Sequence, residues 1–325
     1  MLIISPSLAD ANDGNWQSAR RWAAFLARGC DVAVARDWDG TPADAMIALH
    51  ARRSAGAVQR FAQTGRPLAV VLTGTDLYRD IRSDASAQRS LELAHRLVVL
   101  QELGPHELPA RLRARCEVIY QSARRLAPGH PRVRTFDLAL VGHLRPEKDP
   151  LTALRALARL SPDVAPNHRL RLIHVGGVKD AALGEAFGAM ARGDARVQLR
   201  GVQTHAQARQ TIRNARALLL PSLMEGGANV LIEAVTASVP VLASRIPGSV
   251  GMLGPGYDGF FPVADDAALA RLVHRCQVDP NFLGHLQRQC ARRAPLFEPA
   301  RERAAVRALA HNLVERTGGA RRGQG

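Results

Sequence analysis

The chain has 325 residues, of which 46% are hydrophobic, so it is long and apolar enough for two domains with separate cores. Its lysines and arginines exceed its aspartates and glutamates by 15, which favours a negatively charged substrate or partner. These basic residues are scattered along the chain without a long uninterrupted run, which argues against a nucleic-acid partner.

The cysteines and the apolar runs bear on where the protein works. Cys30, Cys116, Cys276 and Cys290 are far apart and form no Cys-x-x-Cys motif, so we expect neither a disulfide framework nor a cysteine metal site. No apolar run approaches the roughly 18 residues of a membrane span, and Pro6 ends the first run too early for a signal peptide. We therefore expect a cytoplasmic protein without a membrane span.

Short apolar stretches alternate with helical patterns through the first part of the chain. This alternation is typical of an α/β domain in which helices cover both faces of a doubly wound parallel sheet. A basic, turn-rich stretch at residues 121–134 predicts a linker to a second domain. We expect strands at residues 2–6, 32–35, 44–50, 68–72, 97–100 and 116–120, and a first helix at residues 17–28.

Polar side chains follow three of these strands, where open α/β sheets bind their ligands. The arginines among them suit a phosphate group, whereas the hydroxyls and the carboxylate suit a polar substrate. The structural alternatives are a helix cap for Asn15, packing for Trp16, a structural hydrogen bond for His50 and an ordinary capped turn at residues 73–76. The candidate residues are Gly14, Asn15 and Trp16, then His50, Arg52 and Arg53, and then Thr73, Gly74, Thr75 and Asp76.

The second part of the chain repeats the alternation, with strands expected at residues 136–141, 169–175, 197–199, 216–220 and 240–244. The first of these strands leads into a loop where Asp149 and Pro150 predict a helix start. Arg145 and Lys148 precede that start. Two fixed cations at such a position would neutralise a diphosphate and stabilise the charge that develops when a glycosidic bond to it breaks.

The segment at residues 221–234 combines a strand end, a glutamate, two glycines and a helix. Gly226 and Gly227 let a ligand approach the backbone, and the first N–H groups of the helix suit phosphate or sugar oxygens. Glu225 lies in the loop, and we expect Glu233 about two turns into the helix. Each carboxylate suits a vicinal diol, whereas the alternative is a helix with two unrelated surface acids.

This segment resembles the donor-site motif of GT-B glycosyltransferases of the family 4 type, in which seven residues separate two glutamates. The resemblance implies two Rossmann-like, doubly wound domains that face a cleft. It also implies that Glu225 binds hydroxyls of the donor sugar and that Glu233 binds the ribose. The family has a Gly-Arg loop followed by Lys, but His143 stands in place of that arginine, so either Arg145 takes over its role or the phosphate clamp is weaker.

The same resemblance divides the chain and its candidate residues. It implies an acceptor-side domain at residues 1–130, to which a helix at residues 295–317 returns, a nucleotide-sugar domain at residues 131–294 and a flexible tail at residues 318–325. The ten candidate residues that follow the strands of the first domain become acceptor-side residues. The implied catalytic residues are Glu225, Lys148 and Arg145. The implied donor-binding residues are Glu233, Gly226, Gly227, Ala228, Asn229, Gly142, His143 and Gly201.

A narrower resemblance covers nearly the whole chain and is carried by residues 15–22, 49–54, 73–78, 142–145 and 224–230. These parts are similar to the selenosugar synthase (SenB) family. The resemblance implies transfer of a sugar from a UDP-sugar, UDP-GlcNAc or UDP-glucose, to selenophosphate, with a new C–Se bond, in selenoneine biosynthesis. No metal or other cofactor is implied, since lysine and arginine supply the positive charge.

The residues alone leave two alternatives open. One is a family 4-like glycosyltransferase with another small anionic, thiol or lipid acceptor. A lipid acceptor predicts an exposed apolar and basic patch on the first domain, which the sequence does not clearly show. The other alternative is a non-catalytic protein that binds polyanions and kept the fold.

Overall fold

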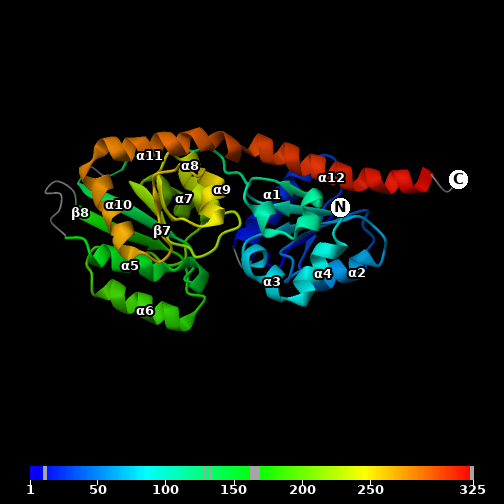
Figure 1. Ribbon diagram of the computed structural model, residues 1–325, viewed down its shortest axis with the longest axis horizontal. Helices are drawn as coiled ribbons and strands as arrows, with labels where there is room; N and C mark the ends of the chain where they lie inside the picture. Colours follow the sequence, from blue (N-terminus) through cyan, green and yellow to red (C-terminus); the bar gives the residue numbers. More distant parts are fainter. Residues whose placement is uncertain (10–12, 128, 132–133, 162–168, 323–325) are drawn as a thin grey trace. The chain divides into compact units, whose positions relative to one another are not determined.

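The computed structural model describes residues 1–325 except for residues 10–12, 128, 132–133, 162–168 and 323–325 (Figure 1). It contains two compact units, and the first is assembled from separate parts of the chain. Unit 1 contains Met1–Ser122, Glu225–Gly227 and Pro299–Gly325, and unit 2 contains Ala123–Met224 and Ala228–Glu298. Unit 2 begins within the stretch predicted as a linker, of which residues 128 and 132–133 lie outside the described residues.

Unit 1 is built on a six-stranded sheet with the order β2-β1-β3-β4-β5-β6, and its strands all run parallel. Its strands are apolar at nearly every position because helices cover both faces, and all five residues of β4 are buried. The direction of winding changes between β1 and β3, where such sheets bind ligands. The strands are β1 (Leu2–Ile4), β2 (Ala33–Ala35), β3 (Met46–Leu49), β4 (Leu68–Leu72), β5 (Arg96–Val99) and β6 (Cys116–Val118).

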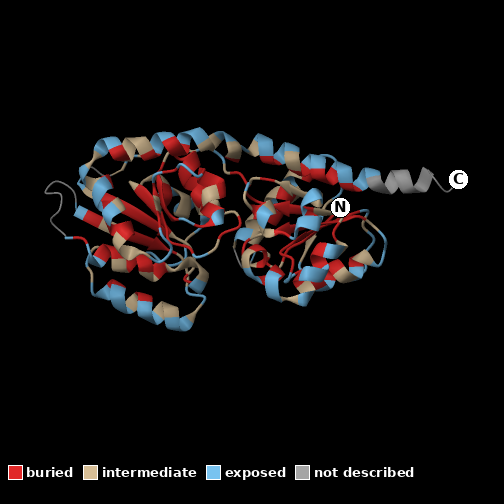
Figure 2. Ribbon diagram, viewed as in Figure 1, coloured by how far each residue is buried: buried red, intermediate tan, exposed pale blue. Residues whose placement is uncertain are grey.

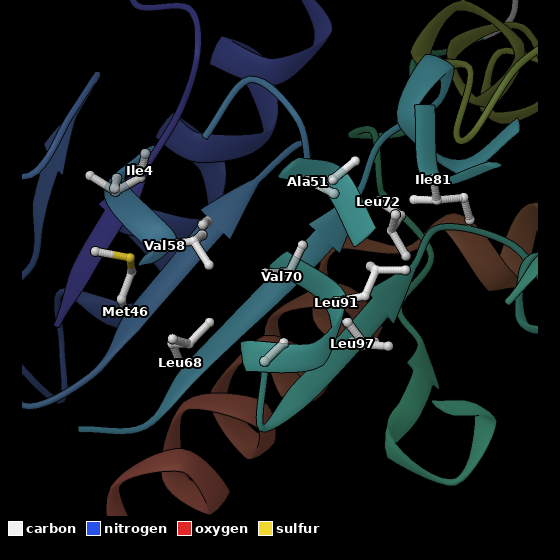
Figure 3. Close-up of a cluster of buried hydrophobic side chains, with 14 of the residues drawn as sticks. Ile4, Met46, Ala51, Val58, Leu68, Val70, Leu72, Ile81, Leu91 and Leu97 are labelled. Atoms are coloured by element: carbon white, nitrogen blue, oxygen red, sulfur yellow. The ribbon is translucent and has the colours of Figure 1, made fainter. Parts of the chain in front are cut away.

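Two hydrophobic clusters join helices to the faces of this sheet. On one face, Met46 and Val70 of the strands pack in one cluster with Val58 of α2 (Ala55–Ala62) and Leu91 of α4 (Ala85–Leu93), as Figure 3 shows. The short helix α3 (Ile81–Ser83) adds Ile81 to the same cluster.

The second face of the sheet is covered by helices from opposite ends of the chain. Trp22 of α1 (Gly14–Leu26) and Val306 and Leu309 of α12 (Pro299–Arg322) are fully or almost fully buried in one cluster with the strands. Residues 318–322, expected in a flexible tail, belong to α12, and residues 323–325 of that tail lie outside the described residues.

Unit 2 contains a second six-stranded parallel sheet with the order β12-β11-β10-β7-β8-β9. Counted from β7, this is the 3-2-1-4-5-6 order of dinucleotide-binding folds, and the winding reverses between β7 and β10. The sequence did not predict β12, which has two residues. The strands are β7 (Thr135–Val141), β8 (Arg169–Val175), β9 (Val197–Leu199), β10 (Ala217–Leu220), β11 (Val241–Ser244) and β12 (Phe260–Phe261).

Helices cover both faces of this sheet, because right-handed crossovers on either side of the reversal leave it on opposite faces. The helix α5 packs against α6 and α10, whereas α8 packs against α7 and α11 (Figure 1). The central strands of both sheets are buried, and the outer sides of the helices are exposed (Figure 2). The helices are α5 (Pro150–Ala158), α6 (Ala181–Arg192), α7 (His205–Arg213), α8 (Asn229–Thr236), α9 (Pro247–Leu253), α10 (Asp266–Val278) and α11 (Pro280–Arg293).

The predicted α/β class with two doubly wound parallel sheets is therefore confirmed. Among the described residues, no helix combines the length and the apolar character that crossing a lipid bilayer requires.

A buried carboxylate fastens α12 to the rest of unit 1. Glu302 is 2% exposed, and its Oε1 accepts a hydrogen bond from Trp22 Nε1 at 2.7 Å. Its Oε2 accepts hydrogen bonds from Arg21 Nε at 2.7 Å and from Ser122 Oγ at 2.5 Å. One side chain thus joins α12, α1 and the end of the first part of unit 1.

We expect Glu302→Ala to lower the free energy of unfolding by about 3 to 5 kcal/mol, because it leaves a guanidinium and an indole N–H without their buried acceptor. Urea denaturation measures this change. Glu315→Ala is the control, since Glu315 pairs with His311 at 3.0 Å on an exposed part of α12, and such pairs contribute about 0 to 1 kcal/mol. Equal losses in the two variants would contradict an anchoring role for Glu302.

Candidate functional site

The winding of unit 2 reverses between β7 and β10, and the loops that follow these two strands are joined to each other. The backbone N–H of Leu223, after β10, donates to the carbonyl of Glu147, after β7, at 2.9 Å. Open α/β sheets bind ligands in the crevice at such a reversal. The segment that leads to the two glutamates and the loop that carries the predicted cations are therefore neighbours.

Backbone hydrogen bonds also join the loops that follow β7, β8 and β9. The N–H of Leu144 donates to the carbonyl of Gly177, and the N–H of Gly176 donates to the carbonyl of Gly201, at 2.8 and 2.9 Å. The approach is so close that a Cβ at Gly176 would lie 1.9 Å from the carbonyl oxygen of Gly142. Three separated loops thus form one row, in which the predicted residues Gly142, His143 and Gly201 come together.

His143 takes part in this row through its ring. The backbone N–H of Gly177 donates to His143 Nδ1 at 3.0 Å, so the Nδ1 lone pair is engaged with the neighbouring loop. His143 therefore connects the loops after β7 and β8 through this hydrogen bond. An arginine, which the family pattern has at this position, would present several N–H donors to a phosphate.

Arg145 and Lys148 lie on the loop after β7, at the two ends of a short 3₁₀ turn, Pro146–Lys148. The backbone N–H of Lys148 donates to the carbonyl of Arg145 at 3.0 Å, which fixes the turn. Arg145 lies 3.8 Å from the Glu147 carboxylate and its side chain is 33% exposed, so it keeps access to solvent and to a ligand. Both cations are thus presented by one rigid loop.

The helix after this loop starts at Pro150 as predicted, but its cap differs from the expected one. Asp149 has a φ of +39° and makes no side-chain hydrogen bond to the backbone of α5. Its carboxylate instead accepts a hydrogen bond from Thr152 Oγ1 at 2.5 Å.

The N-terminus of α8 has no capping side chain. Its N-cap residue is Ala228, and Asn229 is the first helical residue. A helix start without a side-chain cap leaves N–H groups that suit an anion. Both residues were predicted to bind the donor.

Glu233 is the fifth residue of α8, so it lies just over one turn from the helix start and not two turns as expected, because the helix begins at Asn229. The residue is 6% exposed, and its Oε1 lies 2.5 Å from Nε2 of His205. Sequence reasoning missed His205, since the two residues are 28 positions apart and meet only when α7 packs against α8.

In unit 1, His50 follows β3 in a left-handed conformation with a φ of +73°, which a residue with a Cβ adopts at some cost. The backbone N–H of Arg53 donates to His50 Nδ1 at 3.3 Å, so the ring proton belongs on Nε2. Nε2–H then donates to Thr75 Oγ1 at 3.1 Å. This leaves the Thr75 hydroxyl proton for another acceptor.

Asp76 does not fit the predicted substrate contact. The residue is 0% exposed, and its Oδ1 accepts hydrogen bonds from the N–H groups of Thr73 and Gly74, both at 2.9 Å. Its Oδ2 accepts from the N–H of Ala51 at 2.9 Å. The carboxylate therefore holds the loops after β3 and β4 together, because both of its oxygens already accept hydrogen bonds from backbone N–H groups.

The two arginines after His50 differ in their surroundings. Arg52 Nε donates to Asp80 Oδ2 at 2.9 Å, which ties it to the π-helical turn Asp76–Asp80. The guanidinium of Arg53 is exposed, and no ion pair to it occurs within the described part of the chain. Arg53 and Thr75 are thus the better placed of these candidates for an anionic ligand.

At the start of α1, the helix cap is Asp13 and not Asn15. Asp13 Oδ1 accepts from the N–H groups of Asn15 and Trp16, both at 3.1 Å, so α1 begins at Gly14, three residues before the predicted start. The side chains of Asn15 and Trp16 are half-buried. Because Asp13 already binds these backbone groups, the start of α1 is not a free anion site.

The segment Glu225–Gly227 belongs to unit 1 and packs closely on its backbone. A Cβ at Gly226 would lie 2.5 Å from the carbonyl group of Thr73, and a Cβ at Gly227 would lie 2.8 Å from Leu100 and Gln121 atoms. Glycine is needed at both positions for this packing. Glu225 is 7% exposed.

Tyr78, at the end of the polar stretch that follows β4, is close enough to Glu225 for the two side chains to interact electrostatically. Burial raises the pKa of its hydroxyl, and the carboxylates of Glu107 and Glu225 add to this effect. The hydroxyl accepts a hydrogen bond from Gln101 Nε2 at 2.8 Å.

One Asp-x-Asp spacing occurs in the chain, at Asp37 and Asp39. Asp37 pairs with Arg60 at 2.6 Å, and Asp39 Oδ1 accepts from the N–H of Thr41 at 2.9 Å. Across the described residues, no three His, Cys, Asp or Glu side chains are grouped closely enough to hold a metal ion.

A cavity of about 350 Å³ lies beside α7 in unit 2. Its lining includes Arg200 and Gln203, which flank Gly201 on the loop after β9, and Gln207 and Thr211 of α7. The cavity therefore borders one of the three loops of the row.

Several solved structures are similar to this chain in fold. Sucrose-phosphate synthase from Thermosynechococcus elongatus is 16% identical over 96% of this chain and 98% of its own, with a TM-score of 0.74. HepE from Anabaena in complex with UDP-glucose is 15% identical over 83% of this chain and 79% of its own, with a TM-score of 0.67. The trehalose 6-phosphate synthase from Burkholderia multivorans is 12% identical over 96% of this chain and 78% of its own, with a TM-score of 0.68.

The chain has the GT-B fold. At these identities the likeness establishes the fold alone. Residues 135–279, from the start of β7 to just past α10, match the family model described as glycosyl transferases group 1. Among curated proteins, no sequence matches this chain significantly.

The buried imidazole of His50 should make stability depend on pH. Burial lowers the pKa of His50 below its usual value of 6.5, although Asp76 opposes the shift. Below that value the unfolded chain takes up a proton that the folded protein does not, so the free energy of unfolding falls as the pH falls.

His50→Asn removes this proton uptake, and asparagine tolerates the left-handed conformation. Between pH 6.5 and about 5, we expect the wild type to lose stability more steeply than the variant, by up to about 1.4 kcal/mol per pH unit. His174, whose pKa burial also lowers, is present in both proteins. The free energies of unfolding come from urea denaturation at each pH. If they fall in parallel for the wild type and the variant, His50 binds its proton equally well in the folded and unfolded states, and the prediction is wrong.

The hydrogen bonds of Asp76 predict a second effect. Asp76→Asn replaces one acceptor oxygen with an NH₂ group, which leaves at least one buried backbone N–H unpaired, so we expect a loss of about 1 to 3 kcal/mol in unfolding free energy. Asp39→Asn, in an exposed turn, should change it by about 0.5 kcal/mol or less. A loss for Asp76→Asn no larger than that of the control would refute the loop-holding role.

Proposed function

We propose that the protein is a glycosyltransferase that transfers a sugar from a UDP-sugar to selenophosphate, as selenosugar synthases of the SenB type do. The observation that carries the donor half is the arrangement in unit 2 of the two cations, the uncapped start of α8 and the buried Glu233. These residues fall within the part of the chain that matches glycosyl transferases group 1. HepE, which shares the fold, was solved with UDP-glucose bound.

In the proposed complex, unit 2 binds most of the donor. Glu233 accepts hydrogen bonds from the ribose hydroxyls, and the first N–H groups of α8 face the diphosphate. Lys148 and Arg145 neutralise the diphosphate and the charge that develops on it. Glu225 binds hydroxyls of the sugar, either GlcNAc or glucose.

Unit 1 supplies the acceptor side of the proposed site. Arg53 and the Thr75 hydroxyl suit an anion, and His50 orients that hydroxyl by donating to its oxygen. The selenium atom attacks the anomeric carbon. The C–Se bond forms as the C–O bond to the diphosphate breaks, and UDP leaves with the bonding electrons.

An ionised selenium nucleophile needs no general base, in the way that a thiolate does not. We propose that no metal or other cofactor takes part, because Lys148 and Arg145 provide the charge that a cation would otherwise supply. We also place the reaction in the cytoplasm, and the four free cysteine thiols support a reducing setting. The acceptor itself rests on the sequence resemblance and on the excess of 15 positive charges.

The first experiment incubates the purified protein anaerobically with a panel of UDP-sugars, with and without selenophosphate, and follows UDP release and product mass. We expect UDP release that depends on selenophosphate, together with a sugar product that contains selenium. If a thiol, phosphate or lipid acceptor triggers UDP release and selenophosphate does not, the protein is still a glycosyltransferase, but the proposal of a selenosugar product is rejected. Binding without any turnover, weakening steeply with salt whatever the nucleotide, would favour a polyanion-binding protein.

Variants test the assigned roles. Glu225→Ala and Lys148→Ala should each lower kcat/KM by about 100-fold or more. Lys148 neutralises the charge that develops on the diphosphate, and Glu225 holds the sugar in place for the reaction. Glu185→Ala, on the exposed side of α6, is the control and should keep full activity. Wild-type rates in the first two variants would reject the proposed site.

A further inference from the structure

His205 is placed and fixed by its own local sequence. It is the first residue of α7, and the preceding residue, Thr204, forms a reciprocal cap with Gln207. The N–H of Thr204 donates to Gln207 Oε1 at 3.0 Å, and the N–H of Gln207 donates to Thr204 Oγ1 at 3.3 Å. Such a cap fixes the first turn of the helix, so the imidazole starts from a rigid backbone.

The ring of His205 contacts the carboxylate of Glu233, the residue that we propose binds the ribose. Nε2 of His205 lies 2.5 Å from Oε1 of Glu233, and the Glu233 side chain is 8% exposed. The His205 side chain is 49% exposed, so the ring reaches from solvent to a buried carboxylate. The contact thus joins the start of α7, just after the loop that follows β9, to the second turn of α8.

This contact decides how the carboxylate can bind a diol. A glutamate on a helix has several rotatable bonds, and an unrestrained one would lose that freedom when it binds a ligand. A hydrogen bond to Oε1 fixes the plane of the carboxylate before the ligand arrives, and a preorganised acceptor binds more tightly. Two adjacent hydroxyls need such a fixed plane because both must reach the carboxylate at once.

We propose that His205 is a positioning residue, which holds Glu233 in the orientation that recognises the 2′- and 3′-hydroxyls of a ribonucleotide. The proposal rests on the proposed function, in which Glu233 binds ribose. It goes further by assigning the preference for a ribonucleotide over a 2′-deoxyribonucleotide to the pair of His205 and Glu233 rather than to Glu233 alone.

A purely structural role, in which the hydrogen bond only joins two helices, makes a different prediction. It would lower stability and weaken all nucleotides alike. Unit 2 offers a matched pair of the same chemistry, since His285 Nε2 lies 2.7 Å from Asp258 Oδ2 with both side chains about half exposed. His285→Leu therefore controls for the loss of a His–carboxylate hydrogen bond.

The test measures the dissociation constants of UDP and 2′-deoxy-UDP by calorimetry for the wild type, His205→Leu, His205→Gln, Glu233→Gln and His285→Leu. We expect His205→Leu to weaken UDP by about tenfold or more and 2′-deoxy-UDP by much less, because a hydrogen bond to a charged group is lost. His205→Gln keeps an N–H donor and should recover most of the preference. His285→Leu should match the wild type, and in turnover the loss for His205→Leu should fall mainly on KM for the donor.

The outcomes separate this inference from the function on which it rests. If Glu233→Gln removes the preference for UDP but His205→Leu keeps it, the positioning role is wrong and the proposed function stands. The same holds if His205→Leu weakens both nucleotides equally. If the wild type binds neither nucleotide, both the proposed function and the role of His205 are rejected.

Discussion

The loops after β7, β8 and β9 are joined by backbone hydrogen bonds, and the candidate donor site depends on this row. The bonds form only because Gly176 lets two backbones approach within contact of each other. Side chains on such loops are held in defined positions, since each loop begins at a strand end that the sheet fixes. Arg145, Lys148 and His205 are therefore presented by a rigid frame, although all three lie at or near the surface.

In both units, buried carboxylates also connect segments that are distant in sequence. Glu302, Asp76 and Glu233 are each less than 7% exposed and each accepts at least one hydrogen bond from a segment distant in sequence. A buried charge is tolerated when donors surround it, and removing its partners is costly. The fold thus uses acidic residues to connect elements that apolar packing alone would leave free to slide.

The sequence predicts the sheets well because strands buried on both faces appear as short apolar runs, as β4 does. It predicts partners poorly. Sequence spacing does not show that Asp76 binds backbone N–H groups instead of a ligand, because its partner Ala51 is distant in sequence. It also does not show that Asp13 caps α1 in place of Asn15. The contact of His205 with Glu233 needs the packing of α7 on α8, and β12 is too short for any periodic signal.

Unit 2 is inserted, in effect, into unit 1. Val306 and Leu309 complete one face of a sheet whose strands all lie before residue 122, while unit 2 ends at Glu298. During synthesis on the ribosome, unit 2 can therefore close its core before unit 1 can, which reverses the usual order from N-terminus to C-terminus. In a nascent chain, one face of the first sheet therefore stays uncovered until α12 emerges from the ribosome. Shortening α12 would expose apolar residues of strands that were synthesised first.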